Sequence, residues 1–308
     1  MISLLEQLLS SNQQQFISTA LSQGIRTDGR TAHIYRNIKI SIVNTNTVEI
    51  SLDGTLVICT VQCSIVTPLP ERGNDGMIYI NCNYTTLINQ YNTEDDTQYN
   101  KNIIEYVVLD RLLNRIFRES NMIDTESLCI LSCKKVWSIN LTCNIINNNG
   151  NIIDCTIYSI MACLLLCRRN DVSVIGDRIT IHPLDDRTPV ALTLHHIVSS
   201  CTYCVINKQF IIVDPNSIEQ QLADSIITIV INNNNDICYL HKPGGCGIAT
   251  QQLIELSNQS LQHITSHIEL LRGAVYEYMQ KSVNKYKQST TKPVDAFGSN
   301  IQLPSGLA

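Results

Sequence analysis

Six basic side chains have the type and spacing to bind a polyanion. Three of them are spaced i, i+4 and i+7 in a segment with helical periodicity, so they should share one helical face. The others lie in a turn-like PERGND segment and at a predicted strand start. Cations so placed bind nucleic-acid phosphates, and the alternative is that they form solvated or intersubunit salt bridges. The candidates are Arg72, Arg111, Arg115, Arg118, Lys134 and Lys135.

A possible zinc site is the HHx4CxxC arrangement of His195, His196, Cys201 and Cys204. These are ligand types that zinc takes. The segment nevertheless alternates like a strand, and a single CxxC pair is more often a pair of buried thiols in a reduced cell. We therefore expect no metal ligands here.

A glycine-rich segment, KPGGCG at positions 242–247, is the other candidate for phosphate binding. It lacks the GxxxxGK[ST] pattern of a phosphate loop and stands between a predicted strand and the last helix. We expect a turn.

The elements that must position these residues form two similar rounds of strands and helices. In the first round, Asp53-Gly54 is a tight-hairpin signal, and 89–100 is a polar exposed loop. Periodicity predicts helices over 2–22, 103–118 and 153–168, and strands over 38–43, 47–52, 55–66, 77–84, 128–131 and 136–146.

In the second round, strands are predicted over 179–182, 190–194, 202–206, 210–213, 225–231 and 237–241, followed by one long helical stretch or two joined ones over 249–287. No composition shift separates the rounds. The sequence therefore predicts a single α+β domain over 1–287, with internal halves at about 25–170 and 171–287, and a disordered tail over 288–308.

Composition excludes several classes of protein. The chain has 308 residues, is 44% hydrophobic and 16% charged, and carries a net charge of -5, which disfavours nucleic-acid binding by bulk positive charge. No apolar run reaches the ~18 residues of a membrane span, and the N-terminus lacks the pattern of a secretory signal. The 13 cysteines stand mostly in apolar runs, which suits a reducing compartment.

Several long strings in this chain resemble one protein family. They are GIRTDGRTAHIYRNIKI, PLPERGNDGMIYINCN, IDTESLCILSCKKVWSINLTCNIINNNGNIID, RRNDVSVIGDRITIHP and FIIVDPNSIEQQLAD. Over roughly residues 10–285 the chain resembles the RNase PH-like ring subunits of the eukaryotic RNA exosome. The resemblance implies the RNase PH fold, an α+β layout with two related βαβα-type halves and sheets packed with helices.

Active members of this family degrade RNA from its 3′ end by phosphorolysis and hold phosphate with a Gly-Gly-(Thr/Ser)-Arg loop at a helix start. In this chain the corresponding residues are Gly150, Asn151, Ile152 and Ile153, so the hydroxyl and the guanidinium are both replaced by isoleucine. Asp154 follows, and we expect its charge to repel an entering anion. The resemblance therefore implies a degenerate phosphate loop.

Active members also carry an acidic pair spaced D-x5-D and a substrate-binding arginine. Here the first acid falls at Ile218, beside Glu219, and only the second is kept, as Asp224. A single carboxylate makes a poor metal site, so Asp224 is expected to be a helix-surface or capping acid. The arginine position falls at Asn102 or its neighbours.

The resemblance thus implies a non-catalytic subunit of the exosome core ring, along which RNA passes to a nuclease, with no catalytic residue, metal or cofactor of its own. The alternative is an active phosphorolytic 3′-to-5′ exoribonuclease. The implied partners are other RNase PH-like subunits, exosome cap proteins and RNA, with no membrane, and the implied locations are the nucleus, including the nucleolus, and the cytoplasm.

Overall fold

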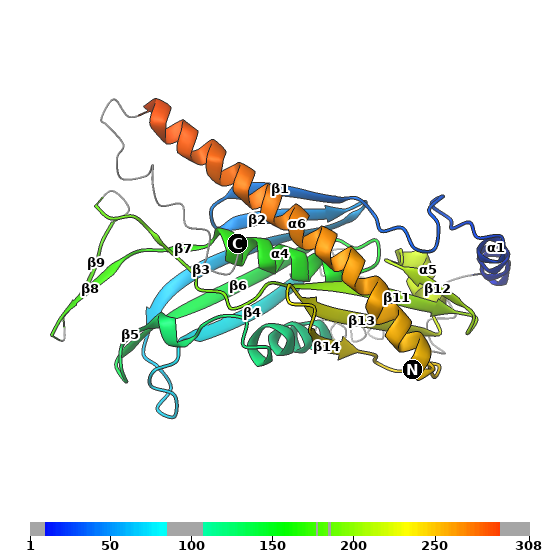
Figure 1. The fold of residues 1–308 in the computed structure, drawn as a ribbon, viewed down its shortest axis with the longest axis horizontal. Helices are drawn as coiled ribbons and strands as arrows, with labels where there is room; N and C mark the ends of the chain where they lie inside the picture. The colour runs from blue at the N-terminus through cyan, green and yellow to red at the C-terminus, as the bar shows by residue number, and fades with distance from the viewer. Residues whose placement is uncertain (1–9, 85–106, 177, 184–185, 290–308) are drawn as a thin grey trace, which may run out of the picture.

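Two main sheets and the helices between and upon them make up the fold (Figure 1). The computed structural model describes residues 10–84, 107–176, 178–183 and 186–289. The predicted loop over 89–100, Asn102 and the tail from 290 onward lie outside the described residues, as does the start of the predicted first helix.

The first sheet has the order β1-β2-β3-β6-β4, with β5 paired to β6. All its pairings are antiparallel except β4 with β6. At the β2–β3 turn Asp53 and Gly54 have φ of 34° and 111°, which confirms the predicted hairpin. Its strands are β1 Ile38–Asn44, β2 Thr47–Leu52, β3 Thr55–Val66, β4 Met77–Tyr84, β5 Cys129–Leu131 and β6 Lys135–Asn147.

The second sheet has the order β12-β11-β13-β14, and all three pairings are antiparallel. Two small hairpin-like sheets, β7 with β10 and β8 with β9, follow the first half. The strands are β7 Arg168–Arg169, β8 Val172–Ile175, β9 Arg178–Ile181, β10 Val190–Ala191, β11 Val198–Ile206, β12 Phe210–Val213, β13 Ser225–Asn232 and β14 Ile237–His241.

Helix α4 (Ile152–Leu166) is apolar around almost its whole circumference and is buried from Asp154 to its end. It packs against β2 and β3 of the first sheet and against β11 of the second. Side chains of both sheets, α4 and α6 (Thr250–Ser289) therefore form one continuous hydrophobic cluster.

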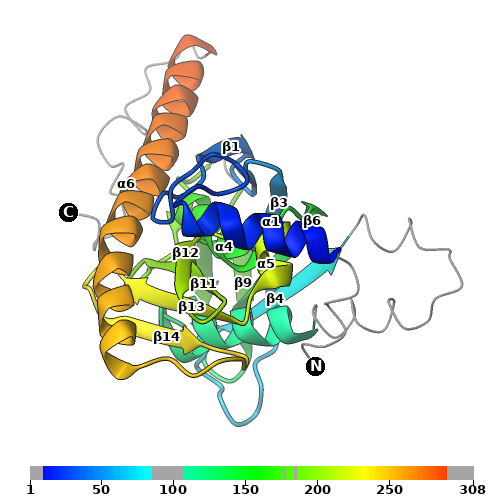
Figure 2. The ribbon, with the colours of Figure 1, turned by 90° about the vertical axis from the view of Figure 1, so that its right-hand side faces the viewer.

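Three shorter helical segments and α1 complete the fold. α1 (Ser11–Ser22) buries Ile17 and Leu21 in a smaller cluster with Cys204, Ile206 and Ile212. It lies beside α5 (Ser217–Leu222) and β12 (Figure 2). The others are the π-helical η2 (Arg115–Glu119) and the 3-10 helix η3 (Glu126–Leu128).

Most element types were predicted, but α5, β7 and η3 were not, and three further elements differ from their predictions. β8 was missed because its four residues are bounded by polar residues and gain strand structure only by pairing with β9. The strand predicted over 190–194 is only the two-residue β10. The helix predicted over 103–118 is α-helical over 107–114 and then widens into η2.

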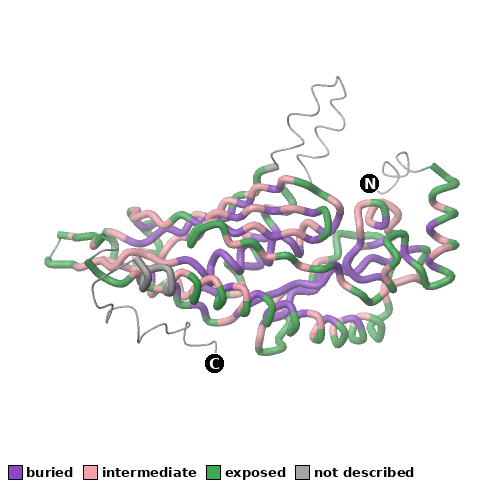
Figure 3. The backbone as a smooth tube through the Cα atoms, turned by 90° about the horizontal axis from the view of Figure 1, so that it is seen from above, coloured by how far each residue is buried: buried purple, intermediate pink, exposed green. Residues whose placement is uncertain are grey.

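Burial follows the sheets and α4 through the centre of the molecule, whereas the β8–β9 hairpin and the outer side of α1 are largely exposed (Figure 3). No helix among the described residues is long and apolar enough to cross a membrane.

α6 docks on the body through a buried histidine. The Tyr158 hydroxyl lies 2.9 Å from His267 Nδ1 and donates to the Ser200 carbonyl at 2.7 Å. The Tyr35 ring meets the His267 ring edge-on, with 4.6 Å between centroids. Burial, together with the neighbouring His263, lowers the pKa of His267 to about 4, so this imidazole is neutral in the folded protein near pH 7.

The His267 site should make stability depend on pH. Its pKa is depressed in the folded state, so the unfolded chain binds the extra proton and folding loses free energy as pH falls from about 6.5 toward 4. From pH 7 to pH 5 we expect a loss of about 2 kcal/mol from this group.

Urea unfolding of wild type and of His267→Gln at both pH values measures this loss. The difference between the two proteins in how the free energy of unfolding changes with pH isolates the contribution of His267 from that of the other histidines. Equal slopes in the two proteins would contradict the assignment.

Candidate functional site

Asp214 is the centre of the candidate site. It follows β12 with φ of 50°, its side chain is fully buried, and its backbone N–H donates to the Thr202 carbonyl at 2.9 Å. The Arg36 guanidinium grips both carboxylate oxygens at 2.8 Å, and the Arg36 backbone N–H adds a third bond at 2.9 Å. Burial raises the pKa of Asp214, but the bonds and charge of Arg36 outweigh burial and hold that pKa below its usual value.

The two arginines of the GIRTDGR string, Arg26 and Arg30, also form hydrogen bonds with the segment around Asp214. Arg30 donates to Asp214 at 3.0 Å. Arg26 pairs with the buried Glu219 of α5, through Nε at 2.9 Å, and donates to the Val213 carbonyl at 2.8 Å. The segment before β1 is therefore fixed to the β12–α5 connection by charge-assisted hydrogen bonds.

The degenerate phosphate loop lies against this arginine cluster. Arg36 donates to the carbonyls of Asn149 and Gly150 at 3.0 and 3.2 Å. Gly150 has φ of 83°, and a Cβ there would stand 2.5 Å from the carbonyl carbon of Asn216. The residue at this point must be glycine because the loop is pressed onto the backbone that leads into α5.

Two loop amides, and the amide of Asn149 just before the loop, are bonded within the protein. Asn149 N–H donates to Thr55 Oγ1 at 3.1 Å, and Gly150 N–H donates to Asn148 Oδ1 at 2.9 Å. Asn151 N–H donates to Gln220 Oε1 of α5 at 3.2 Å. Two of the four loop donors, those of Gly150 and Asn151, are thus satisfied by side chains, as is the donor of the preceding Asn149.

Asp154 corrects one expectation. Its carboxylate is buried and does not face an anion entrance. It accepts hydrogen bonds from Tyr35, Asn151, Ser200 and Thr202, the last through both N–H and Oγ1. Burial raises its pKa even against these bonds. The expected position of Asp154 at an anion entrance is therefore wrong, because its side chain lies in the first turn of α4 and is buried in the core.

The two isoleucines of the loop face the hydrophobic core, as Asp154 does. Ile152 and Ile153 are partly buried and pack against the main hydrophobic cluster. Asn151 has left-handed backbone geometry and is the N-cap residue of α4. Its side-chain amide Nδ2 donates to Asp214 Oδ1 at 2.6 Å. The four loop residues are therefore brought together, as part of the packing of α4 on the Asp214 cluster.

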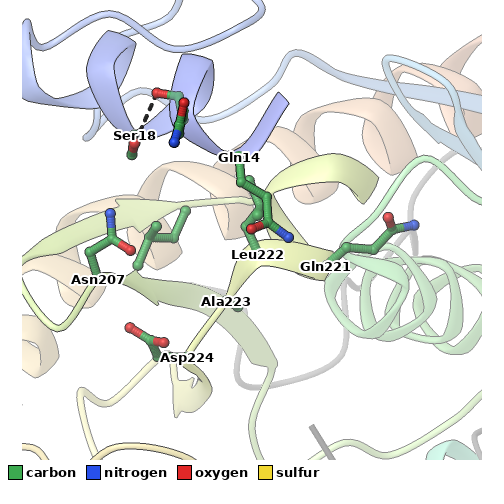
Figure 4. A pocket seen from close by; sticks show the side chains of 9 residues that line it. Gln14, Ser18, Asn207, Gln221, Leu222, Ala223 and Asp224 are labelled. Atoms are coloured by element: carbon green, nitrogen blue, oxygen red, sulfur yellow. Dashed lines mark hydrogen bonds between the residues drawn. The ribbon is translucent and has the colours of Figure 1, made fainter. Parts of the chain in front are cut away.

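Asp224 follows the C-cap residue of α5 and lies outside the helix, so the predicted helix-surface or capping role is wrong. Its carboxylate accepts from Lys208 N–H in the β11–β12 turn at 2.8 Å. It lines a cavity of about 320 Å³ between α5 and α1 (Figure 4). Gln14 and Ser18 of α1 line the opposite wall, and Ile218, at the position of the missing acid, is 41% exposed.

The six basic residues fall into two groups. The turn with Arg72 packs on the turn with Lys134, since Cys133 N–H donates to the Gly73 carbonyl at 2.9 Å, and Lys135 begins β6. The other group is the helix after 107, where the arginines occupy its exposed side. Arg115 reaches the Tyr239 hydroxyl of β14 at 3.2 Å and Glu119 at 3.5 Å. The arginines of the second group are Arg111, Arg115 and Arg118.

The possible zinc ligands do not converge. Cys201 and Cys204 stand three residues apart in β11, so they point to opposite faces of the sheet. Cys201 belongs to the main cluster and Cys204 to the cluster under α1. No group of three metal-ligating side chains occurs among the described residues. The 242–247 segment is the connection from β14 to α6.

Family models match both halves of the chain. The model for domain 1 of the 3′ exoribonuclease family, RNase PH, matches residues 35–170, and that for domain 2 matches residues 196–262. The chain belongs to the 3′ exoribonuclease (RNase PH) family. The predicted family and the RNase PH fold are thereby confirmed.

Similar proteins within the family carry one name. "Exosome complex component rrp45" of Schizosaccharomyces pombe is 29% identical over 279 residues, which cover 90% of this chain and 94% of that protein. RRP45A of Arabidopsis thaliana is 30% identical, and the match covers 92% of this chain and 92% of that protein. Bovine RRP45 is 32% identical. The chain spans 60% of the bovine protein's length. Among the ring subunits, the strings IDTESLC and VDPN predict a resemblance to the polymyositis/scleroderma autoantigen. RRP45 is that subunit, so the predicted resemblance is confirmed.

Two solved structures share the fold. A chain of the Archaeoglobus fulgidus exosome with RNA bound to the active site superposes with a TM-score of 0.68 at 21% identity, covering 83% of this chain and 96% of that one. A chain of an archaeal exosome core gives a TM-score of 0.69 at 20% identity, covering 88% and 98%.

The sequence alone did not single out the Asp214 cluster. Its members are Arg26, Arg30 and Arg36 before β1, and Asp214 and Glu219 near α5, almost two hundred residues later. The available signal was three arginines within eleven residues, ahead of a segment rich in buried strands, and one acid between a strand and an Asn-capped helix.

Removing the Arg36 side chain should be strongly destabilising. Arg36→Ala leaves the Asp214 carboxylate buried without its main partner and removes a donor from four carbonyls. We expect a loss of about 3 to 5 kcal/mol in the free energy of unfolding. Arg187→Ala is the matched control, because its pair with Asp171 is half exposed and should contribute about 1 kcal/mol or less.

Denaturant unfolding of both variants measures the difference. Equal effects from the buried and the exposed pair would refute the central role of Asp214.

Proposed function

We propose that this chain is a non-catalytic subunit of the core ring of an RNA exosome and lies along the path that RNA follows to a nuclease. Its partners are then other RNase PH-like subunits, cap proteins and RNA. The RRP45 relatives, which are named as exosome complex components, support this assignment.

The observation that carries the absence of catalysis is the occupied loop. Phosphorolysis needs phosphate held in line with the terminal RNA bond and its charge neutralised. Asn148 and Gln220 take up the amides of Gly150 and Asn151 instead, and the positions for the hydroxyl and guanidinium are the partly buried Ile152 and Ile153. The acid pair is reduced to Asp224, which binds the Lys208 amide.

We further propose that both halves fold as one unit over 1–287, which the continuous cluster of α4 with both sheets supports. A single calorimetric transition with matching van't Hoff enthalpy is expected, and two separated transitions would contradict it. For the location we propose the nucleus, with the nucleolus, and the cytoplasm. Imaging of the tagged chain tests this, and exclusion from the nucleus would refute it.

The chain should release no nucleoside diphosphates from RNA in the presence of phosphate. One missing transition-state donor typically costs ~10²- to 10³-fold in rate, and here two loop amides are occupied while the cation and one acid are missing. Ile153→Arg alone should not restore activity. The assay follows labelled RNA with and without phosphate, in a ring whose other active subunits are inactivated.

Phosphate-dependent shortening of the RNA that disappears with Asp224→Ala would overturn the proposal. It would establish the alternative, an active phosphorolytic exoribonuclease.

RNA binding by the assembled ring should weaken when Arg111, Arg115 and Arg118 are all changed to Ala. Their exposed guanidinium groups are suited to bind phosphates, so the slope of log affinity against log salt should fall by about 0.7 for each RNA phosphate that is no longer neutralised. Filter binding over a salt series measures it. Arg178→Ala, an exposed arginine of β9, is the control and should leave the slope unchanged.

Unchanged affinity and slope in the triple variant would show that these arginines are structural. For Arg115, that structural role would be its bonds with Tyr239 and Glu119.

A further inference from the structure

A pair of thiols joins the first sheet to the end of α4. Cys63 lies on β3 and Cys167 is the residue that ends α4, 104 positions later, and their sulfur atoms are 3.5 Å apart. Cys167 is held in place by its own backbone, because its N–H donates to the Cys163 carbonyl at 2.8 Å.

The two thiols differ in access to solvent. Cys167 is 1% exposed, whereas Cys63 is partly exposed, at the end of β3 where burial by α4 stops. A second close pair, Cys59 and Cys143, has its sulfur atoms 3.7 Å apart, but both members are fully buried. Of these two pairs, the first therefore combines contact between sulfurs with a route for a small oxidant.

From this geometry we infer that Cys63 and Cys167 form a reversible disulfide when the protein meets a hydroperoxide. Cys63 is the thiol that reacts first with the peroxide, and Cys167 is the resolving thiol. The sulfur atoms have to close from 3.5 Å to the ~2.0 Å of a disulfide. This reaction requires neither RNA nor a ring partner, so it is independent of the proposed function.

The chemistry balances in two steps. The Cys63 thiolate attacks a peroxide oxygen, the O–O bond breaks, and Cys63 becomes a sulfenic acid while the leaving oxygen departs as water or alcohol. The Cys167 sulfur then attacks the Cys63 sulfur, the S–S bond forms, the S–O bond breaks, and a second water leaves with the Cys167 proton. Two thiols lose two electrons, and the peroxide gains them.

The surroundings of Cys63 favour its role as the first thiol. The hydrogen bond from Cys167 lowers the pKa of Cys63 against the opposing effect of burial, and the positive charge of Arg169 lowers it further. Arg169 is itself oriented by its bond to the Ser127 carbonyl at 2.9 Å. The same hydrogen bond, together with burial, raises the pKa of Cys167, which keeps that sulfur protonated until Cys63 is oxidised.

The test treats the full chain with hydrogen peroxide and maps its peptides without reduction. We expect one cross-linked peptide that joins residues 63 and 167, with a mass two hydrogen atoms below the sum of the two reduced peptides. Treatment with dithiothreitol should make this peptide disappear. The melting temperature should rise by a few degrees on oxidation, because the cross-link closes a loop of about a hundred residues in the unfolded chain.

Three variants make the test specific. Cys167→Ser should leave Cys63 as a sulfenic acid that a dimedone probe captures, and Cys63→Ser should abolish the cross-link. Cys133→Ser, which removes an exposed thiol elsewhere, should leave it intact. Since a buried Cys167→Ser change itself lowers stability, the wild-type peptide map is a test by itself.

Oxidation of Cys63 to the sulfinic acid without any cross-link would overturn the inference. So would a cross-link between Cys59 and Cys143 in place of the expected one, since it would show that access does not select the pair.

Discussion

The buried charge of Asp214 is the constraint on which the rest of the structure depends. A carboxylate without solvent is stable only if it is paired and fully hydrogen-bonded. Arg36, Arg30 and Asn151 supply that pairing from three separate segments. The segment before β1, the start of α4 and the β12–α5 connection must therefore meet at one point, which joins the two halves of the chain.

The same constraint shapes the loop ahead of α4. Arg36, which serves Asp214, also takes the loop carbonyls, and Gln220 of α5 takes a loop amide. Gly150 is kept for close packing against Asn216, a requirement of shape and not of phosphate binding. Loop geometry and loop chemistry are thus separate, and a retained glycine is weak evidence for a retained activity.

Local patterns predicted much of the fold. β2, β3, β12 and β14 have the predicted boundaries, because alternation, turn residues and strand propensity act within a few positions. α6 and α4 were also predicted from apolar periodicity. The π-helical turn after residue 114 was not predicted, since it depends on how Ile116 and Phe117 pack. The pairing of β8 with β9 was not predicted either, since it depends on a partner strand.

The sequence by itself determined the family, much of the order of elements and the identity of the loop residues, Gly150 to Ile153, because these are properties of residue identity along the chain. Only the tertiary structure decided where Asp154 points, which atoms occupy the loop amides and which arginines are buried. Those outcomes depend on contacts between residues far apart in the chain, such as Arg36 with Asp214 and Cys63 with Cys167. Burial then sets the charge states and the reactivity of these groups, and burial is not encoded at any single position.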